Sequence, residues 1–334
     1  MRGLKYHVKN KKTNMKKLFT KVVVAMAGFS SVLMAQQDPQ FTQFMHSKLI
    51  FNPGYAGTSN AICANLLYRQ QWVNFQGAPQ TGLLSFDMPV LPYLGVGLNI
   101  MNDEIGAQKT FFARAAVAYN RPIGQGRLGL GIDVGMLQMK INNTWVAPEP
   151  GKDDSSIPGY QATGSAVTNP NLSKVSYDLG FGAFYQIPNK MYVGLSSTHL
   201  PAQTIKGQSD IKFNMARHYY LVAGYVFAIN PRNDIGLNLK VKSDAATTQV
   251  DINLTYEYDK FFWIGVSYRM EDAIAPMLGV RLLKDKGLKI GYSYDYTMSK
   301  IKGYTSGTHE IMIGYCMTKK TTKPTVYGNV RFLD

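Results

Sequence analysis

The stretch from Gly126 to Met136 reads GRLGLGIDVGM, and the chemical character of its side chains alternates along the chain. Large apolar residues occupy every second position, and most of the positions between them hold glycine or aspartate. Because successive side chains of a β-strand point to opposite faces, this period of two predicts a strand with one apolar and one small or polar face. Apolar residues facing lipid and polar residues facing a lumen are typical of a membrane β-barrel.

The same alternation returns along the rest of the chain. Counting such segments gives about fourteen strands, with 12 or 16 as alternatives, at 61–70, 80–88, 93–101, 109–121, 127–139, 174–187, 190–199, 216–229, 233–242, 247–258, 261–270, 275–284, 287–298 and 308–317. Connections after even-numbered strands are short, and those after odd-numbered strands are mostly longer, as in outer-membrane barrels. The sequence therefore predicts an all-β, transmembrane antiparallel β-barrel of the outer-membrane type. A soluble sandwich also alternates, but it usually places charge outside and large residues inside.

Composition excludes several other classes of protein. The chain has 334 residues, of which 45% are hydrophobic and 17% charged, so it is not intrinsically disordered. Two cysteines exclude a disulfide-rich scaffold and a multi-cysteine zinc cluster. The formal charge of +15 includes eight basic residues within 1–35, which leaves only +7 for the remainder. We therefore expect no nucleic-acid partner.

The first 35 residues have the pattern of a secretory signal. Basic residues precede the apolar run 22–34, and the small residue Ala35 precedes a polar stretch. A start at Met15 looks more natural than one at Met1, and a membrane anchor would need a longer apolar run. We expect a signal peptide at 1–35, an N-terminal periplasmic or plug segment at 36–60, the barrel at 61–317 and a periplasmic tail at 318–334. This organisation predicts an exported protein of the bacterial outer membrane, in contact with its lipid.

The residues of the mature chain do not favour catalysis. None of the histidines, His46, His199, His218 and His309, lies in a nucleophile motif, and neither G-x-S-x-G nor H-E-x-x-H occurs. We therefore expect no enzyme activity, no cofactor and no metal site.

Charged residues are expected on the lumen face by strand parity. They are Asp87, Arg114, Asp133, Asp178, Lys240, Lys242, Asp251, Glu257, Arg269, Arg281, Lys289 and Asp295. Charges of both signs in a narrow lumen favour a mutually paired network that closes the interior. A selective pore would instead need one sign to dominate along a continuous path.

Cys63 and Cys316 lie near the beginning of the first strand and near the end of the last strand. Closure of the barrel makes these two strands neighbours, and parity turns both side chains toward the lumen. An oxidising compartment would permit a disulfide across this seam, whereas the alternative is two unrelated small residues.

The segment 36–60 is too apolar for a solvated tail, yet it has neither the helix nor the strand period. It could fold back as a plug in the periplasmic mouth, or it could dock a periplasmic partner. Candidate partner contacts are Phe41, Phe44, Phe51, Tyr55, Trp72, Phe75 and Trp145, together with Lys319 and Lys320 of the basic tail. Any substrate-facing surface is expected in the segments 71–79, 140–173, 200–215 and 299–307, because long loops carry the specificity of barrels.

Several motifs give the chain a resemblance to a known family. They are QDPQFTQFM at 37–45, FNPGYAG at 51–57, YRQQWV at 68–73, NDEIG at 102–106, RHYY at 217–220, FWIG at 262–265, GYSYDY at 291–296 and GTHEIM at 307–312. In their order they resemble the PorP/SprF family of outer-membrane proteins of the type IX secretion system of Bacteroidetes. Thr42 and the stretch His46–Lys48 depart from the usual family pattern.

The resemblance implies a part in a secretion or gliding apparatus. Its implied partners are adhesin-like substrates and the periplasmic ring or peptidoglycan-linked components of the machine, with the barrel as a scaffold for export or surface anchoring. Composition and spacing by themselves indicate only an exported barrel. The alternative function is therefore a passive transporter of the porin or fatty-acid-transporter kind.

Overall fold

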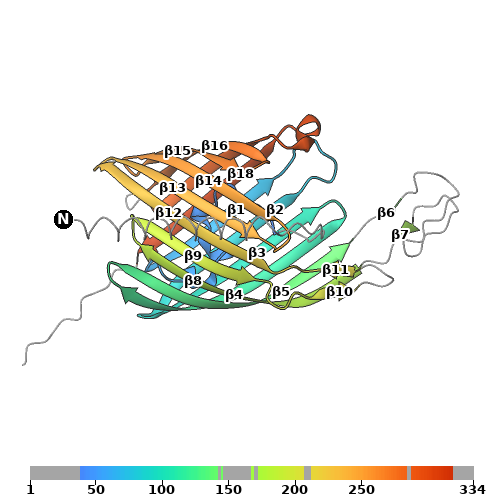
Figure 1. Ribbon diagram of the computed structural model, residues 1–334, viewed down its shortest axis with the longest axis horizontal. Helices are drawn as coiled ribbons and strands as arrows, with labels where there is room; N and C mark the ends of the chain where they lie inside the picture. The colour runs from blue at the N-terminus through green and yellow to red at the C-terminus, as the bar shows by residue number, and fades with distance from the viewer. Residues whose placement is uncertain are drawn as a thin grey trace, which may run out of the picture.

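The computed structural model describes residues 38–141, 144–145, 167–168, 172–206, 212–283 and 287–318. Its main sheet closes on itself in the order β1-β18-β17-β16-β15-β14-β13-β12-β9-β8-β5-β4-β3-β2, and all neighbouring strands are antiparallel. Figure 1 shows the resulting cylinder of tilted strands. The prediction of a fourteen-stranded antiparallel barrel is confirmed, and each predicted strand corresponds to one barrel strand.

The barrel strands have the following bounds: β1 (Ala61–Gln70), β2 (Gln80–Leu91), β3 (Leu94–Ile105), β4 (Gln108–Ile123), β5 (Gly126–Ile141), β8 (Leu172–Ile187), β9 (Met191–Thr198), β12 (His218–Asn230), β13 (Asn233–Ser243), β14 (Thr248–Tyr258), β15 (Phe262–Arg269), β16 (Ala273–Leu282), β17 (Leu288–Thr297) and β18 (Thr308–Thr318). Two small hairpins lie in segments expected to be loops: β6 (Thr144–Trp145) with β7 (Val167–Thr168), and β10 (Thr204–Lys206) with β11 (Lys212–Asn214).

We call the two ends of the barrel the loop end and the turn end. The loop end is where β1, β5, β9 and β17 stop and the longer connections follow. The turn end carries the short connections, such as the one between β4 and β5. The expected orientation places the turn end in the periplasm.

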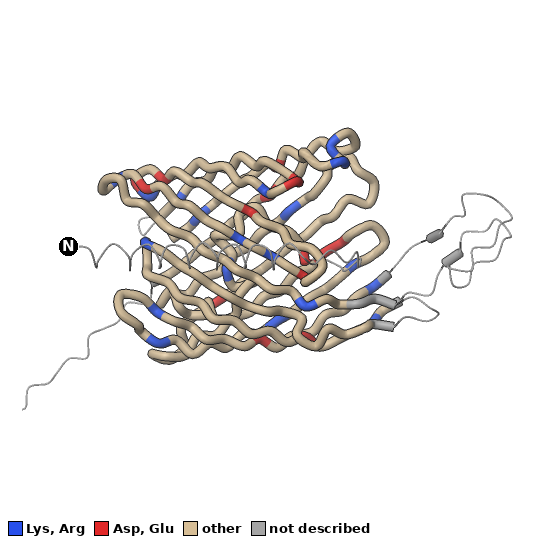
Figure 2. Tube along the Cα trace, viewed as in Figure 1, with Lys and Arg blue, Asp and Glu red and all other residues tan. Residues whose placement is uncertain are grey.

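Alternation along the strands sorts side chains between lipid and lumen. Ile132 and Val134 on the outer face of β5 are 58% and 56% exposed, whereas Asp133 between them is 2% exposed. The outer surface is apolar on every barrel strand, and the charged residues of the strands mostly point inward. Figure 2 shows charges of both signs along a barrel trace that is otherwise largely uncharged. This is the distribution that a membrane barrel requires.

The N-terminal segment from Asp38 to Asn60, which we call the plug segment, occupies the lumen (Figure 1, blue). It contains three short 3-10 turns, η1 (Phe44–His46), η2 (Lys48–Ile50) and η3 (Pro53–Tyr55), while η4 (Lys300–Tyr304) lies in a loop. Asp38 contacts residues at the loop end, and the segment reaches the turn end before it joins β1. We expected a plug in the periplasmic mouth or a docking segment; the structure instead places these residues along the height of the lumen.

Apolar side chains of the plug segment form the core of the barrel. Phe41, Phe44 and Phe51 are at most 3% exposed, and they pack with wall residues that include Phe112 and Phe184. The lack of a helix or strand period in this segment is explained by its surroundings, because the wall encloses it and every side receives contacts.

Glycines on the lumen face let the plug segment approach the wall. A Cβ atom at Gly131 of β5 would lie 2.4 Å from the carbonyl carbon of Pro53, and one at Gly129 would lie 2.0 Å from the carbonyl oxygen of Gly54. Gly182 of β8 faces the Asn52 side chain equally closely. The small residues of the period-two pattern therefore make the space that η3 occupies.

A disulfide closes the seam of the barrel between its first and last strands. Cys63 of β1 is directly opposite Cys316 of β18, with 4.1 Å between their Cα atoms. The structure thus brings together the two cysteines that parity placed on the lumen face.

No helix in the described ranges is long and apolar enough to cross a bilayer.

Candidate functional site

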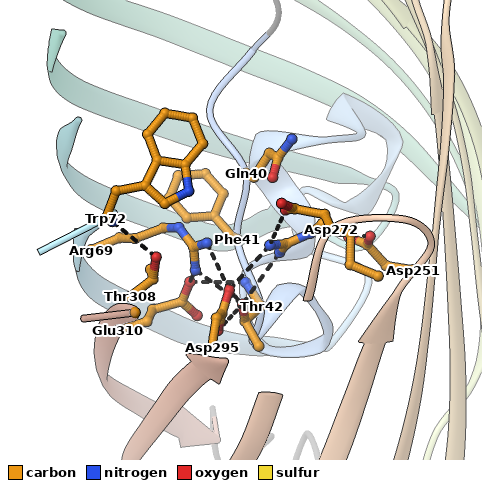
Figure 3. Close-up of polar contacts among 12 residues, drawn as sticks. Gln40, Phe41, Thr42, Arg69, Trp72, Asp251, Asp272, Asp295, Thr308 and Glu310 are labelled. Carbon is orange, nitrogen blue, oxygen red and sulfur yellow. Dashed lines mark hydrogen bonds and ion pairs between the residues drawn. The ribbon is translucent and has the colours of Figure 1, made fainter. Parts of the chain in front are cut away.

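Buried charges near the loop end hold the beginning of the plug segment. One group, which we call the arginine cluster, surrounds Arg69 of β1 (Figure 3). The Arg69 guanidinium lies 2.7 Å from Asp295 Oδ2 of β17 and 3.0 Å from Glu310 Oε2 of β18. All three residues are at most 1% exposed. Three neighbouring strands are therefore connected by one buried cation.

The same carboxylates receive hydrogen bonds from the plug segment. The backbone N–H groups of Thr42 and Gln43 donate to the two carboxylate oxygens of Glu310, at 2.8 and 2.7 Å. The Thr42 hydroxyl donates to Asp295 at 2.8 Å and accepts from Arg69 Nη1 at 2.9 Å. Since hydrogen bonds to charged groups are among the strongest in proteins, this cluster fixes the plug segment at Thr42.

The arginine cluster extends along the wall to β13, β14 and β15. Arg269 contacts both Asp295 and Asp251, at 3.1 and 3.3 Å. Lys240 Nζ lies 2.7 Å from Asp251 Oδ2 and donates to the backbone carbonyl of Phe41 at 3.1 Å. The plug segment is thus held from several strands at once.

A second group, the histidine cluster, binds the plug segment at Asp38 from the opposite wall. Asp38 Oδ1 lies 2.9 Å from His199 Nε2, and Asp38 Oδ2 accepts from the Tyr220 hydroxyl at 2.6 Å. Lys242 Nζ donates to the Asp38 backbone carbonyl at 2.9 Å. The other ring nitrogen of His199 lies 3.0 Å from Asp178 Oδ2.

The electrostatics of the histidine cluster favour a positive charge between the two aspartates. Burial lowers the pKa of His199, but the carboxylates of Asp38 and Asp178 outweigh burial and raise that pKa to about 9. Arg114 of β4 lies 2.8 Å from Asp178 Oδ2, the oxygen that also faces His199, and 3.4 Å from Asp133. The cluster therefore forms a continuous chain of opposite charges from the wall to the plug segment.

Toward the turn end, the described contacts of the plug segment are hydrogen bonds rather than ion pairs. The Asn52 amide donates to the backbone carbonyls of Ala183 and Leu195, each at 3.0 Å. The Asn120 amide donates to the Ala56 carbonyl at 2.8 Å, and the Gly57 N–H donates to Asp87 Oδ2 at 3.1 Å. These bonds satisfy backbone groups that would otherwise be buried without partners.

The lumen charges identified by parity lie where the sequence placed them. Asp87, Arg114, Asp251, Arg269 and Asp295 are all at most 4% exposed. Glu257 and Arg281 form a separate, partly exposed pair at 2.6 Å. Parity also gives Arg69 and Glu310, which were not among the predicted lumen charges, although they share the lumen face of β1 and β18 with Cys63 and Cys316. Their signal was therefore present in the sequence.

The candidate partner contacts differ in their exposure and position. Phe41, Phe44 and Phe51 are buried in the lumen, so these aromatic rings belong to the core and offer no surface to a partner. Tyr55 is partly buried and packs edge-on against Phe184. Phe75 is 42% exposed in the connection between β1 and β2, next to the half-buried Trp72. Trp145 belongs to β6, and Lys319 and Lys320 lie outside the described residues.

A cavity lies beside the histidine cluster, between the plug segment and the wall. Its lining is mixed: Phe41, Phe51, Met101, Phe112, Leu137 and Met215 supply apolar surface, and Asp38, Asp103, Arg114, His199, His218 and Tyr220 supply polar groups. The plug segment therefore forms one side of the cavity.

Comparison with solved structures finds outer-membrane barrels. The toluene transporter TodX of P. putida aligns at a TM-score of 0.50 with 11% identity, over 81% of this chain and 94% of that chain. The toluene transporter TbuX of Ralstonia pickettii aligns at 0.49 with 11% identity, over 81% and 93%. A FadL homologue of Pseudomonas aeruginosa aligns at 0.40 with 11% identity, over 77% and 89%. At such identities the likeness concerns the fold alone.

Sequence comparison is more specific. A search of curated proteins found no match. The family model described as type IX secretion system membrane protein PorP/SprF matches residues 33–315, which include the whole plug segment and nearly all of the barrel. The chain is therefore a member of the PorP/SprF family of type IX secretion system membrane proteins.

Proposed function

We propose that this protein is a closed outer-membrane scaffold of type IX secretion, which acts through its loop end and its turn end and does not conduct through its lumen. The observation that carries the proposal is the plug segment, which fills the lumen and is held by an ion pair at Asp38 and by hydrogen bonds from Thr42 to buried carboxylates. Opening the lumen would break the hydrogen bonds that Thr42 and Gln43 donate to Asp295 and Glu310, and hydrogen bonds to buried charged groups are costly to lose.

The two ends would meet different partners. The loop end presents the exposed Phe75 and Tyr304 on connections joined by hydrogen bonds between Val73 and the backbone of 306–307. An adhesin-like substrate would bind there, whether for export or for surface anchoring. The turn end would contact the periplasmic ring or the peptidoglycan-linked components of the machine.

We also propose that the protein is not an enzyme. His199 and His218 face Asp38 of the plug segment, and these contacts attach the plug segment to the wall. The polar groups of the lumen thus serve to attach the plug segment to the barrel wall.

Gene deletion with mass spectrometry of surface-bound and released proteins tests this function. Loss of one adhesin-like protein, or its loss from the surface alone, would support a dedicated export or anchoring partner. Loss of the whole secreted set would support a place in the core machine. An unchanged profile would contradict both secretion roles.

A second function, passive uptake of a small molecule, is favoured by the cavity beside the histidine cluster, whose mixed lining includes apolar side chains such as Phe41, Met101 and Leu137. Toluene transporters are among the barrels of similar fold. Uptake assays and single-channel recordings on the purified protein distinguish the two functions, because the closed scaffold predicts neither uptake nor conductance.

A further inference from the structure

Three side chains of the histidine cluster lie close enough together to share one ion. Asp38, His199 and His218 each offer a ligand atom, and these atoms all lie within 4.8 Å of one another. The two histidines are 5% and 2% exposed, and the Asp38 side chain is 26% exposed. They come from the plug segment, the residue after β9 and the first residue of β12.

The neighbours of His199 orient it as a ligand. Its Nε2 points at Asp38 Oδ1, 2.9 Å away, while its Nδ1 lies 3.0 Å from Asp178 Oδ2. Asp178 is held in turn by Arg114 at 2.8 Å. A carboxylate on the far nitrogen of a histidine is the usual second layer of a metal site, because it fixes the ring and raises its basicity.

The other two side chains are also held in place. Tyr220 donates to Asp38 Oδ2 at 2.6 Å, which fixes the carboxylate. His218 Nδ1 lies 4.0 Å from that oxygen and 3.1 Å from the Ala216 carbonyl, and its Nε2 accepts from the Asp38 N–H at 3.3 Å. The two imidazole rings stand edge to face, with 5.6 Å between their centroids.

We propose that Asp38, His199 and His218 form a binding site for one divalent transition-metal ion, with Zn²⁺ as the first candidate. Two imidazole nitrogens and one carboxylate suit Zn²⁺ better than Mg²⁺ or Ca²⁺, which prefer oxygen ligands. All three side chains line the cavity, so a fourth ligand, such as water, would have room there. The ion would attach the plug segment to β9 and β12.

Metal titration of the purified, folded, full-length protein tests the site. The protein is prepared without a histidine tag, treated with EDTA and titrated with Zn²⁺ by calorimetry, and Co²⁺ is used as an absorbing substitute. We expect one ion per chain and an upward shift of the unfolding temperature with Zn²⁺, since a ligand that binds only the folded state stabilises it.

Three variants identify the ligands. Asp38→Asn and His199→Gln should weaken Zn²⁺ binding at least tenfold, whereas His309→Gln should bind like the wild type. His309 is a suitable control because its ring contacts Tyr292 and Tyr294, away from the cluster. The gel shift between unheated and boiled samples verifies that each variant is folded. If Asp38→Asn or His199→Gln does not fold, His218→Gln is used in its place. Absence of saturable Zn²⁺ binding by the wild type, or equal binding by all variants, would overturn the site.

Discussion

Cys63 and Cys316, 253 residues apart in the chain, form a disulfide between the first and last strands of the barrel. The bond is an addition to a seam that is already paired, because every residue of β1 from Ala61 to Gln70 has a partner on β18. It lies near the turn end, while the arginine cluster connects the same two strands near the loop end. The seam is therefore fixed at both ends by different chemistry.

Removing the disulfide should weaken the folded barrel without preventing its closure. Cys63→Ser together with Cys316→Ser removes a cross-link over a long loop, which is worth about 2–5 kcal/mol. Samples are heated to increasing temperatures before electrophoresis, and the temperature at which the band of the folded barrel disappears is measured. This temperature should fall in the double variant and equally in the reduced wild type. An unchanged temperature in both samples would show that the seam does not depend on this bond.

Removing the buried cation of the arginine cluster should be strongly destabilising. Arg69→Met removes the cation that contacts Glu310 and leaves Asp295 with Arg269, and breaking a buried ion pair costs about 3–5 kcal/mol. Lys109→Met is the control, because Lys109 and Glu104 form a pair whose side chains are 49% and 37% exposed. An exposed pair is worth at most about 1 kcal/mol. Equal losses in denaturant unfolding would contradict the importance of burial.

Adding a side chain at one of the lumen-facing glycines should displace the plug segment from the wall. Gly131→Val places a side chain where Pro53 lies, so η3 would have to move and segment 49–57 should become accessible to protease. Gly82→Ala is the control, because nothing lies within 4 Å of a Cβ atom at that position. Identical protease resistance of both variants would mean that the contact at Gly131 is not required.

Deleting the plug segment should convert a closed barrel into a conducting one. The wild type should give no stable current in a planar bilayer, whereas a variant lacking residues 38–57 should, because the described lumen is filled mainly by this segment. The gel shift verifies that the shortened barrel has folded. Stable currents from the wild type would contradict a closed lumen.

Strand number and strand position could be predicted from the sequence. The pattern at 126–136 specifies which side chains face lipid, because a strand that spans a bilayer has only two faces and the outer one must be apolar. A one-residue shift in register would turn every side chain of a strand to the opposite face, so the alternation also locates the strand. The predicted and observed strand boundaries therefore agree to within a few residues. Lumen residues such as Asp133 and Asp178 followed from the same parity.

The contents of the lumen could not be predicted in this way. The segment 38–60 has no regular period of apolar residues, because it receives contacts from all sides and no single face is buried more than the others. Asp38 lies 161 residues from His199 and 182 residues from Tyr220 in the chain, so no local spacing relates them.

The sequence by itself determined a barrel of about fourteen strands and the residues on its two faces, because the alternation of side chains along a strand is a local property of the chain. Its motifs indicated the family. Tertiary structure alone decided that the plug segment fills the lumen, that Arg69 holds it through Asp295 and Glu310, and that Asp38 meets two histidines. Closing a sheet brings distant strand ends together around a common interior, and the partners found there depend on the register and curvature of the whole barrel.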